Sequence, residues 1–322
     1  MVKPKSKVSS ALELNKVTVV VTVFNESATI DSLIASLKSQ TLTPNEVIVV
    51  DGESTDGTYQ KLQSLAKSWP ILKIFKRQGN RSVGRNLAIA NSKFQIIAIT
   101  DAGCQPDPDW LENIIAPFSN PDVKIVSGYY RGLAKTVFQK CLIPYVLVMP
   151  DKAEKYEFFP STRSMAMRKE VWQKSEGFPE NLFHNEDFAY AHKLKKLGYQ
   201  FTFASKAVVG WFPRTTLKSA AWMFLRFAIG DIQSGILRRK VKFLVIRYWA
   251  FLFFVFLSFE IPWLFKPLSL ICFAYLAWAI AKNYKYVKHV GAFFWLPVLQ
   301  ITADITVLFG SLVGLLSRST LK

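Results

Sequence analysis

Two aspartates, Asp51 and Asp101, stand at the ends of short apolar runs that are rich in β-branched residues. Such runs are typical of buried strands, and ligands of open α/β sheets bind outside the carboxyl ends of the strands. A carboxylate there can hold a metal ion, or accept hydrogen bonds from the base and ribose of a nucleotide. Asn25 and Glu26 follow another such run. Each of these positions is also compatible with an ordinary turn or helix cap.

Two arginines complement these acids. Arg81 and Arg85 lie in the segment 79–86. The planar guanidinium group suits the oxygens of a diphosphate better than a lysine ammonium does. A solvated loop is the alternative interpretation of this segment.

The elements that must position these residues alternate along the first third of the chain. Strand patterns at 17–23, 47–50, 72–75 and 96–100 are separated by segments with helical spacing of apolar residues. This order predicts a mostly parallel sheet with right-handed crossovers, a Rossmann-like α/β fold. The first strand is not followed by Gly-x-Gly-x-x-Gly, and a Walker-type lysine loop is absent. We therefore do not expect a dinucleotide dehydrogenase or a P-loop NTPase.

Composition indicates a membrane part and an anionic partner. Half of the 322 residues are hydrophobic, and the formal net charge is +18. Such a charge suits a membrane surface, a phosphorylated substrate or nucleic acid. The three cysteines form no Cys-x-x-Cys pair, which indicates neither a disulfide framework nor a zinc site. Residues 1–16 are basic and polar, so we expect a loose tail rather than a secretory signal.

Residues 213–242 predict an amphipathic helix followed by a basic linker. An apolar face that ends in a basic cluster is typical of a helix lying at a membrane interface. Packing on the catalytic domain is the alternative. The expected interfacial residues are Trp222, Arg226, Arg238, Arg239, Lys240 and Lys242.

Residues 243–322 predict a membrane domain with about three transmembrane helices, at 243–265, 266–282 and 293–316. Lysines cluster after the second segment, and the positive-inside rule then places the preceding domain in the cytoplasm. The expected location is the cell membrane, with several spans. Asp304 lies within the third span, where an acid has either a structural or a substrate-related role.

Six short motifs, taken in order, resemble those of family 2 inverting glycosyltransferases. The resemblance runs from about residue 17 to 230. It implies a GT-A fold at 17–212 and transfer of a sugar from a UDP- or GDP-linked donor. The motifs are Val19-Val-Val-Thr-Val-Phe-Asn-Glu26, Val49-Val-Asp-Gly-Glu-Ser-Thr-Asp-Gly57, Gly84-Arg-Asn86, Asp101-Ala-Gly103, Gly177-Phe178 and Asn185-Glu-Asp187.

The resemblance also implies roles for individual residues. Asp187 would be the general base and Glu186 would orient the site, although acids at a helix start also favour the helix dipole. Asp101 would be the first acid of an Asp-x-Asp element. The expected nucleotide-sugar-binding residues are Thr22, Asn25, Glu26, Asp51, Arg81, Arg85 and Asp101.

The metal site departs from the family pattern. Gly103 stands where relatives often carry the second aspartate, so Asp101 would be the only carboxylate ligand. Mg²⁺ keeps waters and binds substrate phosphates, so Mg²⁺ or Mn²⁺ is still expected. Trp211 occupies the position of a histidine that some relatives carry before a Pro-Arg pair.

The sequence as a whole predicts a membrane-anchored glycosyltransferase of cell envelope biosynthesis. The expected acceptor is a polyprenyl phosphate or a lipid-linked saccharide, with no nucleic-acid partner and with a homo-oligomer left open. One alternative is a processive polysaccharide synthase, which the absence of a Gln-x-x-Arg-Trp signature disfavours. The other is a catalytically silent scaffold that binds nucleotide sugar.

Overall fold

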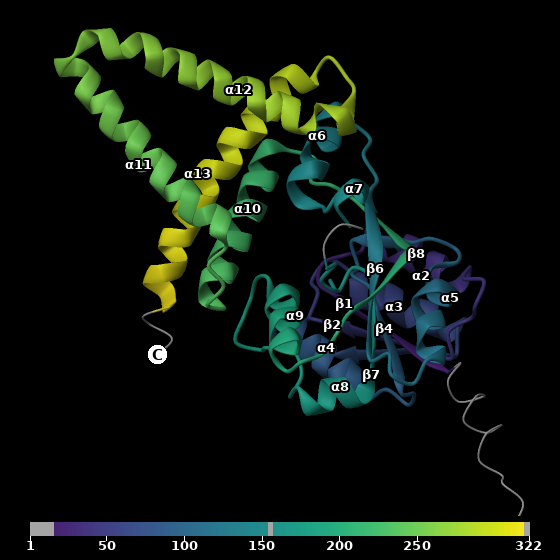
Figure 1. Cartoon of the computed structure of the whole chain (residues 1–322). Coiled ribbons are helices and arrows are strands. Elements are labelled where there is room, and N and C mark those ends of the chain that lie inside the picture. Colours follow the sequence, from purple (N-terminus) through teal and green to yellow (C-terminus); the bar gives the residue numbers. More distant parts are fainter. Residues whose placement is uncertain (1–15, 154–156, 319–322) are drawn as a thin grey trace, which may run out of the picture. The chain divides into compact units, whose positions relative to one another are not determined.

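The computed structural model describes residues 16–153 and 157–318 (Figure 1). Most of the expected basic tail therefore lies outside the described residues. The chain divides into two compact units. The first contains Met1–Leu133 and Pro150–Phe212, and the second contains Ala134–Met149 and Pro213–Lys322. The structure thus differs from the expected 17–212 domain, because residues 134–149 belong to the second unit.

The described part of the first unit contains one eight-stranded mixed sheet with the order β3-β2-β1-β4-β7-β6-β8-β5. Its first four neighbours, β3 to β4, pair in parallel, and β6 pairs in parallel with β8. The pairs β4–β7, β7–β6 and β5–β8 are antiparallel. The strands are β1 (Val17–Val23), β2 (Glu46–Asp51), β3 (Leu72–Lys76), β4 (Ile96–Ile99), β5 (Cys104–Pro106), β6 (Ile125–Gly132), β7 (Met165–Arg168) and β8 (Thr202–Trp211).

Helices cover both faces of this sheet. A reversal of strand order at β1 carries the crossover helix α4 to the face opposite α2 and α3, because each crossover is right-handed. On the α4 face, the buried core joins strand residues to Val171 of α8 and Leu194 of α9. The first unit's helical elements are α2 (Ile30–Lys38), α3 (Thr58–Lys67), α4 (Arg81–Ala90), α5 (Trp110–Ile115), η1 (Ala116–Ser119), α7 (Pro150–Ala153), α8 (Lys169–Lys174) and α9 (Glu186–Lys196).

This arrangement confirms the predicted α/β fold with a mostly parallel, Rossmann-like sheet and apolar C-terminal helices. The alternation of strands and helices correctly indicated β1 to β4. Later in the chain, Thr202–Trp211 forms the single long strand β8. A register shift in the β6–β8 pairing, between Gly128 and Tyr129, lies along this strand pair.

The second unit is helical. Among the described residues, three of its helical segments are long and apolar enough to cross a membrane, namely Arg239–Glu260, Pro262–Val287 and Ala292–Ser317. Large apolar side chains such as Phe243, Trp249 and Phe273 are exposed along them, as expected for surfaces that face lipid. The elements are α6 (Val137–Val146), α10 (Leu217–Gln233), α11 (Arg239–Glu260), η2 (Pro262–Leu264), α12 (Phe265–Val287) and α13 (Ala292–Arg318).

The apolar stripe of α10 packs along α13 (Figure 1). Gly310 and Gly314 of α13 permit the close approach, since a Cβ at Gly310 would lie 2.6 Å from the backbone oxygen of Leu225. Two glycines four residues apart are a common contact surface between membrane helices. The stripe is therefore covered by another helix of the second unit, whereas Trp222 and Arg226 remain exposed on α10.

Asp304 is the centre of a polar network within the second unit. Its carboxylate accepts hydrogen bonds from Arg247 Nη2 at 2.9 Å and from Gln300 Nε2 at 3.0 Å. The hydroxyl groups of Tyr248, at 3.1 Å, and of Tyr275 also donate to it. These partners lie on α11, α12 and α13, so a single buried acid ties all three helices together. The network favours the structural role over the substrate role.

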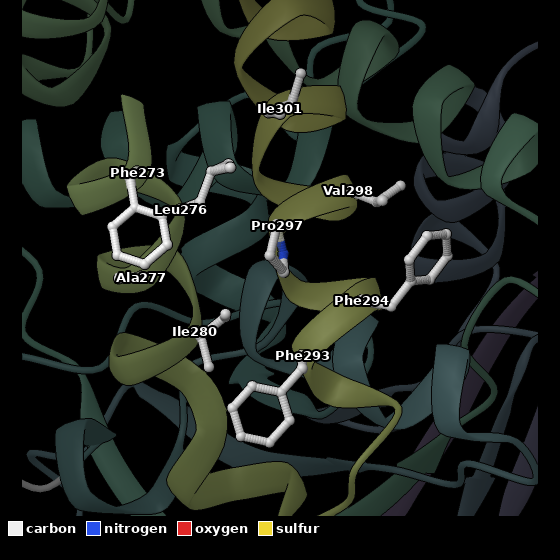
Figure 2. A pocket seen from close by; sticks show the side chains of 9 residues that line it. All are labelled: Phe273, Leu276, Ala277, Ile280, Phe293, Phe294, Pro297, Val298 and Ile301. Carbon is white, nitrogen blue, oxygen red and sulfur yellow. The ribbon is translucent and has the colours of Figure 1, made fainter. Parts of the chain in front are cut away.

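An apolar groove runs along α12 and α13 and has a volume of about 440 Å³ (Figure 2). A neighbouring hollow shares Ala277, Ile280 and Phe293 with it and extends to Tyr284 and Lys285. The groove therefore continues from purely apolar walls to a basic end. Its lining residues are Phe273, Leu276, Ala277, Ile280, Phe293, Phe294, Pro297, Val298 and Ile301.

The Asp304 network predicts a specific loss of stability. We expect Asp304→Ala to destabilise the helical unit by about 1–2 kcal/mol, because several polar groups lose their shared partner. Thermal unfolding of the full chain in detergent measures the effect. Glu260→Gln, at an exposed acid near the end of α11, is the control and should change little. Equal melting temperatures for Asp304→Ala and the wild type would contradict a structural role.

Candidate active site

The polar residues expected to form a site lie at one edge of the sheet. Asp51 is the last residue of β2, Asn25 follows β1, and Asp101 follows β4. These three strands are adjacent and parallel, so their carboxyl ends coincide. Loops and helix starts beyond this edge supply the remaining residues.

Asp51 has a carboxylate oxygen available for a ligand. The side chain is fully buried, and its Oδ1 accepts a hydrogen bond from the Ser54 backbone N–H at 2.8 Å. Its Oδ2 is buried and has no hydrogen-bond partner among the described residues. Such an orphaned acceptor is costly unless a ligand or water satisfies it. This geometry suits a donor group on a base or ribose.

The loop after β1 is tied to the loop after β2. Asn25 adopts a left-handed conformation with φ of 56°, and its Oδ1 accepts a hydrogen bond from the Thr55 N–H at 2.9 Å. The Glu26 N–H donates to Thr58 Oγ1 at 2.8 Å, so both loops are held together beside Asp51.

Thr22 has a different environment from these loop residues. Its side chain packs against the start of α4, where a Cβ at Gly84 would lie 2.8 Å from Thr22 Cγ2. Gly84 is therefore needed for the close approach of α4 to β1. Thr22 positions this helix, and its expected contact with nucleotide stays a prediction.

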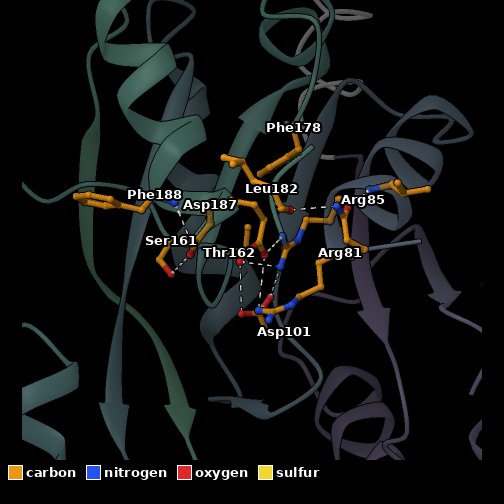
Figure 3. Close-up of polar contacts among 12 residues, drawn as sticks. Arg81, Arg85, Asp101, Ser161, Thr162, Phe178, Leu182, Asp187 and Phe188 are labelled. Carbon is orange, nitrogen blue, oxygen red and sulfur yellow. Dashed lines mark hydrogen bonds and ion pairs between the residues drawn. The ribbon is translucent and has the colours of Figure 1, made fainter. Parts of the chain in front are cut away.

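Arg85 joins two parts of the site (Figure 3). Its side chain is 1% exposed, and it donates to Glu186 Oε1 at 2.8 Å and to Asp101 Oδ1 at 2.9 Å. It also donates to Thr162 Oγ1 at 3.0 Å. Burial lowers the pKa of Arg85, but the charges of Asp101 and Glu186 outweigh burial and raise it above its ordinary value. Arg85 thus pairs with two carboxylates of the protein itself, and its expected contact with the nucleotide sugar stays a prediction.

Arg81 is placed differently on the same helix. It is 59% exposed on its side chain and lies 3.6 Å from Glu186 Oε1. A pair at that distance and exposure holds the arginine only weakly. Of the two arginines, Arg81 is therefore the one whose charge is accessible to an incoming diphosphate.

Asp187 begins α9 beside Glu186 but faces other partners (Figure 3). Its Oδ2 accepts a hydrogen bond from Ser161 Oγ at 2.9 Å, and its Oδ1 accepts one from the Phe188 N–H. Burial raises the pKa of Asp187, but the charges of Arg163 and Arg85 together with these hydrogen bonds lower it below its ordinary value. Asp187 is thus ionised at neutral pH.

The sequence interpretation missed Ser161, Thr162 and Arg163. They precede β7, which is antiparallel to β4 and pairs Met165 with Ile99. The amino end of an antiparallel strand lies at the carboxyl end of its parallel neighbours, so this loop reaches the same edge. A search restricted to residues after strands cannot find it.

The site fits a metal ion only with substrate ligands. Among the residues described, no group of three His, Cys, Asp or Glu side chains could hold a metal. Asp101 Oδ2 accepts only a long hydrogen bond of 3.4 Å from Thr162, and a Cβ at Gly103 would meet nothing within 4 Å. One carboxylate oxygen beside open space suits Mg²⁺ or Mn²⁺ that is bound mainly by water and a diphosphate.

Comparison with known proteins agrees with this fold. Residues 18–172 match the family described as Glycosyl transferase family 2. This part of the chain therefore resembles a family 2 glycosyltransferase domain. Glycosyltransferase AglE of Haloferax volcanii is 28% identical over 233 residues, which cover 69% of this chain and 75% of that protein. The O-antigen chain rhamnosyltransferase RfbN of Salmonella typhimurium is 27% identical over 206 residues, 60% of this chain and 65% of its own length.

A solved structure shares the fold. The mannosyltransferase PcManGT of Pyrobaculum calidifontis, in complex with GDP-Man and Mn²⁺, superposes with a TM-score of 0.57 at 21% identity. The match covers 91% of this chain and 87% of that chain. The family match and the relatives together support glycosyltransferase activity for this domain.

The buried Arg85 predicts a large effect on folding. Arg85→Gln should lower the free energy of unfolding by about 3–5 kcal/mol, because Glu186 would stay buried without its countercharge. Denaturant unfolding of the purified chain measures the change. Arg81→Gln, on the same helix but exposed, is the matched control with an expected loss below about 1 kcal/mol. Equal losses for the two variants would contradict the bridging role of Arg85.

Proposed function

We propose that this protein is an inverting glycosyltransferase that moves a sugar from a UDP- or GDP-linked donor to a membrane lipid acceptor. The acceptor is a polyprenyl phosphate or a lipid-linked saccharide, and transfer takes place at the cytoplasmic face. The observation that carries the proposal is the placement of the Asp187 carboxylate, which accepts a hydrogen bond from Ser161, at the same sheet edge as the unpartnered Oδ2 of Asp51. Asp187 acts on the acceptor, and Asp51 binds the nucleotide.

On the donor side, Asp51 accepts hydrogen bonds from the base or ribose through its orphaned Oδ2. The tied loops of Asn25 and Glu26 border the nucleotide, and the exposed Arg81 approaches the diphosphate. The GDP-Man in the PcManGT structure supports a nucleotide-sugar donor. Asp101 would hold the metal ion, which when bound would supply positive charge to the leaving diphosphate.

The reaction is a single displacement at the anomeric carbon. A hydroxyl of a lipid-linked saccharide loses its proton to Asp187 as its oxygen attacks, and the bond from carbon to the diphosphate oxygen breaks. The nucleoside diphosphate leaves with the bonding electrons. A lipid phosphate is already ionised, so with that acceptor Asp187 orients the nucleophile instead. Glu186, through Arg85, keeps Asp101 and the start of α9 in place.

Four features support a lipid acceptor and a cytoplasmic site. Three segments are suited to span a bilayer, and the hollow that continues the groove along α12 and α13 reaches Lys285. Basic residues at the start of α11 and near the end of α12 lie at the same end of an antiparallel helix pair, which the positive-inside rule assigns to the cytoplasm. Relatives include a dolichol-phosphate mannosyltransferase of Pyrococcus furiosus, 26% identical over 121 residues.

The residues expected at the membrane interface lie on α10 and around the start of α11, and most of them are exposed. Trp222 is 52% exposed, and the Arg226 guanidinium lies 5.9 Å from its ring centroid. Arg239, Lys240 and Lys242 are exposed at the start of α11. Arg238 is an exception, because it pairs with Asp231 of α10 and holds the turn between the helices. We propose that the other five contact anionic headgroups.

Replacement of Asp187 tests the catalytic part of the proposal. Asp187→Asn should lower transfer to a hydroxyl acceptor by about 10²–10⁴-fold, because the amide cannot accept the proton. Donor affinity should be unchanged. Mass spectrometry of lipid products from a panel of nucleotide sugars and lipid acceptors gives the readout. Asp109→Asn, at an exposed acid before α5, is the control. Undiminished transfer by Asp187→Asn to every acceptor would remove Asp187 from the reaction.

Metal dependence tests the donor side separately. We expect a chelator to abolish transfer and Mn²⁺ or Mg²⁺ to restore it, because the diphosphate needs more positive charge than Arg81 alone supplies. Asp101→Asn should raise the metal concentration for half-maximal rate, measured by titration of the chelated enzyme. Full activity in excess chelator would show that protein cations alone stabilise the leaving group.

A further inference from the structure

Arg163 is a half-buried cation at the same sheet edge as Asp187. It stands in the loop before β7. Its guanidinium carbon lies 5.5 Å from the ring centroid of Tyr130 and 5.7 Å from that of Trp211. Two aromatic rings of the β6 and β8 strands thus fix the plane of the group by cation–π contact.

The guanidinium group has unused donors. It carries five N–H donors, and within the described ranges its one hydrogen bond is from Nη1 to Ser161 Oγ at 3.1 Å. No carboxylate of the described residues lies within ion-pair distance of it, whereas Arg85 is paired with two. A partly desolvated arginine with free donors is suited to bind an anion, and its planar fork matches phosphate oxygens.

Ser161 links this arginine to the acceptor side of the site. The same Ser161 oxygen that accepts from Arg163 donates to Asp187 Oδ2 at 2.9 Å. Asp187 and Arg163 are also close enough for their charges to interact. Asp187 is the carboxylate whose charge acts most strongly on Arg163, with Asp101 after it, so an anion on Arg163 lies beside Asp187.

We infer that Arg163 binds the phosphate of the lipid acceptor, so that the nucleophile is a lipid phosphate oxygen. This rests on the proposed function and selects between its two acceptor classes. The phosphate oxygen forms the bond to the anomeric carbon as the bond to the nucleoside diphosphate breaks. The acceptor is ionised before the reaction, so no proton has to move. Asp187 orients the phosphate, and Arg163 holds it against the repulsion of that carboxylate.

Kinetics of the full chain in detergent, with polyprenyl phosphate as acceptor, test the inference. Arg163→Gln should raise the KM for polyprenyl phosphate about 10- to 100-fold, as loss of charge-assisted hydrogen bonds predicts. The KM for donor should stay within about twofold, a shift too small to represent a lost ion contact. Arg163→Lys should give an intermediate acceptor KM, because it keeps the charge but loses the fork.

Two controls separate binding from folding. Slow hydrolysis of the donor in the absence of acceptor should continue in Arg163→Gln, which shows an intact donor site. Arg131→Gln is the matched variant, since Arg131 lies on β6 next to Tyr130 but its charge is already paired with Asp107. It should leave both KM values unchanged.

Three outcomes would overturn the inference. A rise in donor KM alone would assign Arg163 to the donor diphosphate. A fall in kcat with both KM values unchanged would make Arg163 only a partner of Asp187. Wild-type transfer to a lipid-linked saccharide but to no lipid phosphate would refute the phosphate nucleophile and leave the proposed function standing. Failure of the proposed function itself is distinct, because the wild type would then glycosylate no lipid.

Discussion

The buried guanidinium of Arg85 is the constraint on which the active site depends. A cation that is 1% exposed has to be paired, and its partners come from β4 and α9, which are far apart in sequence. Glu186 is drawn toward Arg85, and successive residues of a helix point about 100° apart. Asp187 therefore points in another direction, toward Ser161, although the charge of Arg85 still acts on it. One internal ion pair thus fixes the direction of the proposed acceptor residue.

The residues predicted best from sequence are those whose position follows from local pattern. Asp51 and Asp101 stand at the ends of apolar runs. Because the carboxyl ends of parallel strands meet at one edge of a sheet, this pattern alone places the two acids at the same edge. Arg85 was predicted to bind nucleotide sugar, and the sequence did not indicate its internal partners Asp101 and Glu186. Its contact with Glu186 spans 101 residues of chain, and no local pattern distinguishes a protein carboxylate from a diphosphate as the anion that it binds.

In the helical second unit, too, the sequence does not identify contacts between residues that are far apart in the chain. Periodicity identifies the apolar face of α10, but periodicity does not say what covers that face. The structure supplies α13, whose Gly310 and Gly314 form the surface that α10 contacts. Asp304 is similar, because the sequence marks an acid within a span but cannot assemble partners from three helices. In both cases the missing information is the identity of a neighbour distant in sequence.

The two arginines of the site differ in how much of their charge the protein itself neutralises, and this difference bears on the chemistry. Arg85 is neutralised by carboxylates and therefore stabilises the fold. Arg163 is only partly compensated, and together with Arg85 it lowers the pKa of Asp187 against the effect of burial. A carboxylate that is more acidic than usual is a weaker base, and so it takes the proton of a hydroxyl group less readily than an ordinary aspartate does. The ionised Asp187 carboxylate can instead orient an acceptor that has no proton to lose. A cation with free donors beside a weakly basic acid is thus a coherent arrangement for an ionised phosphate nucleophile.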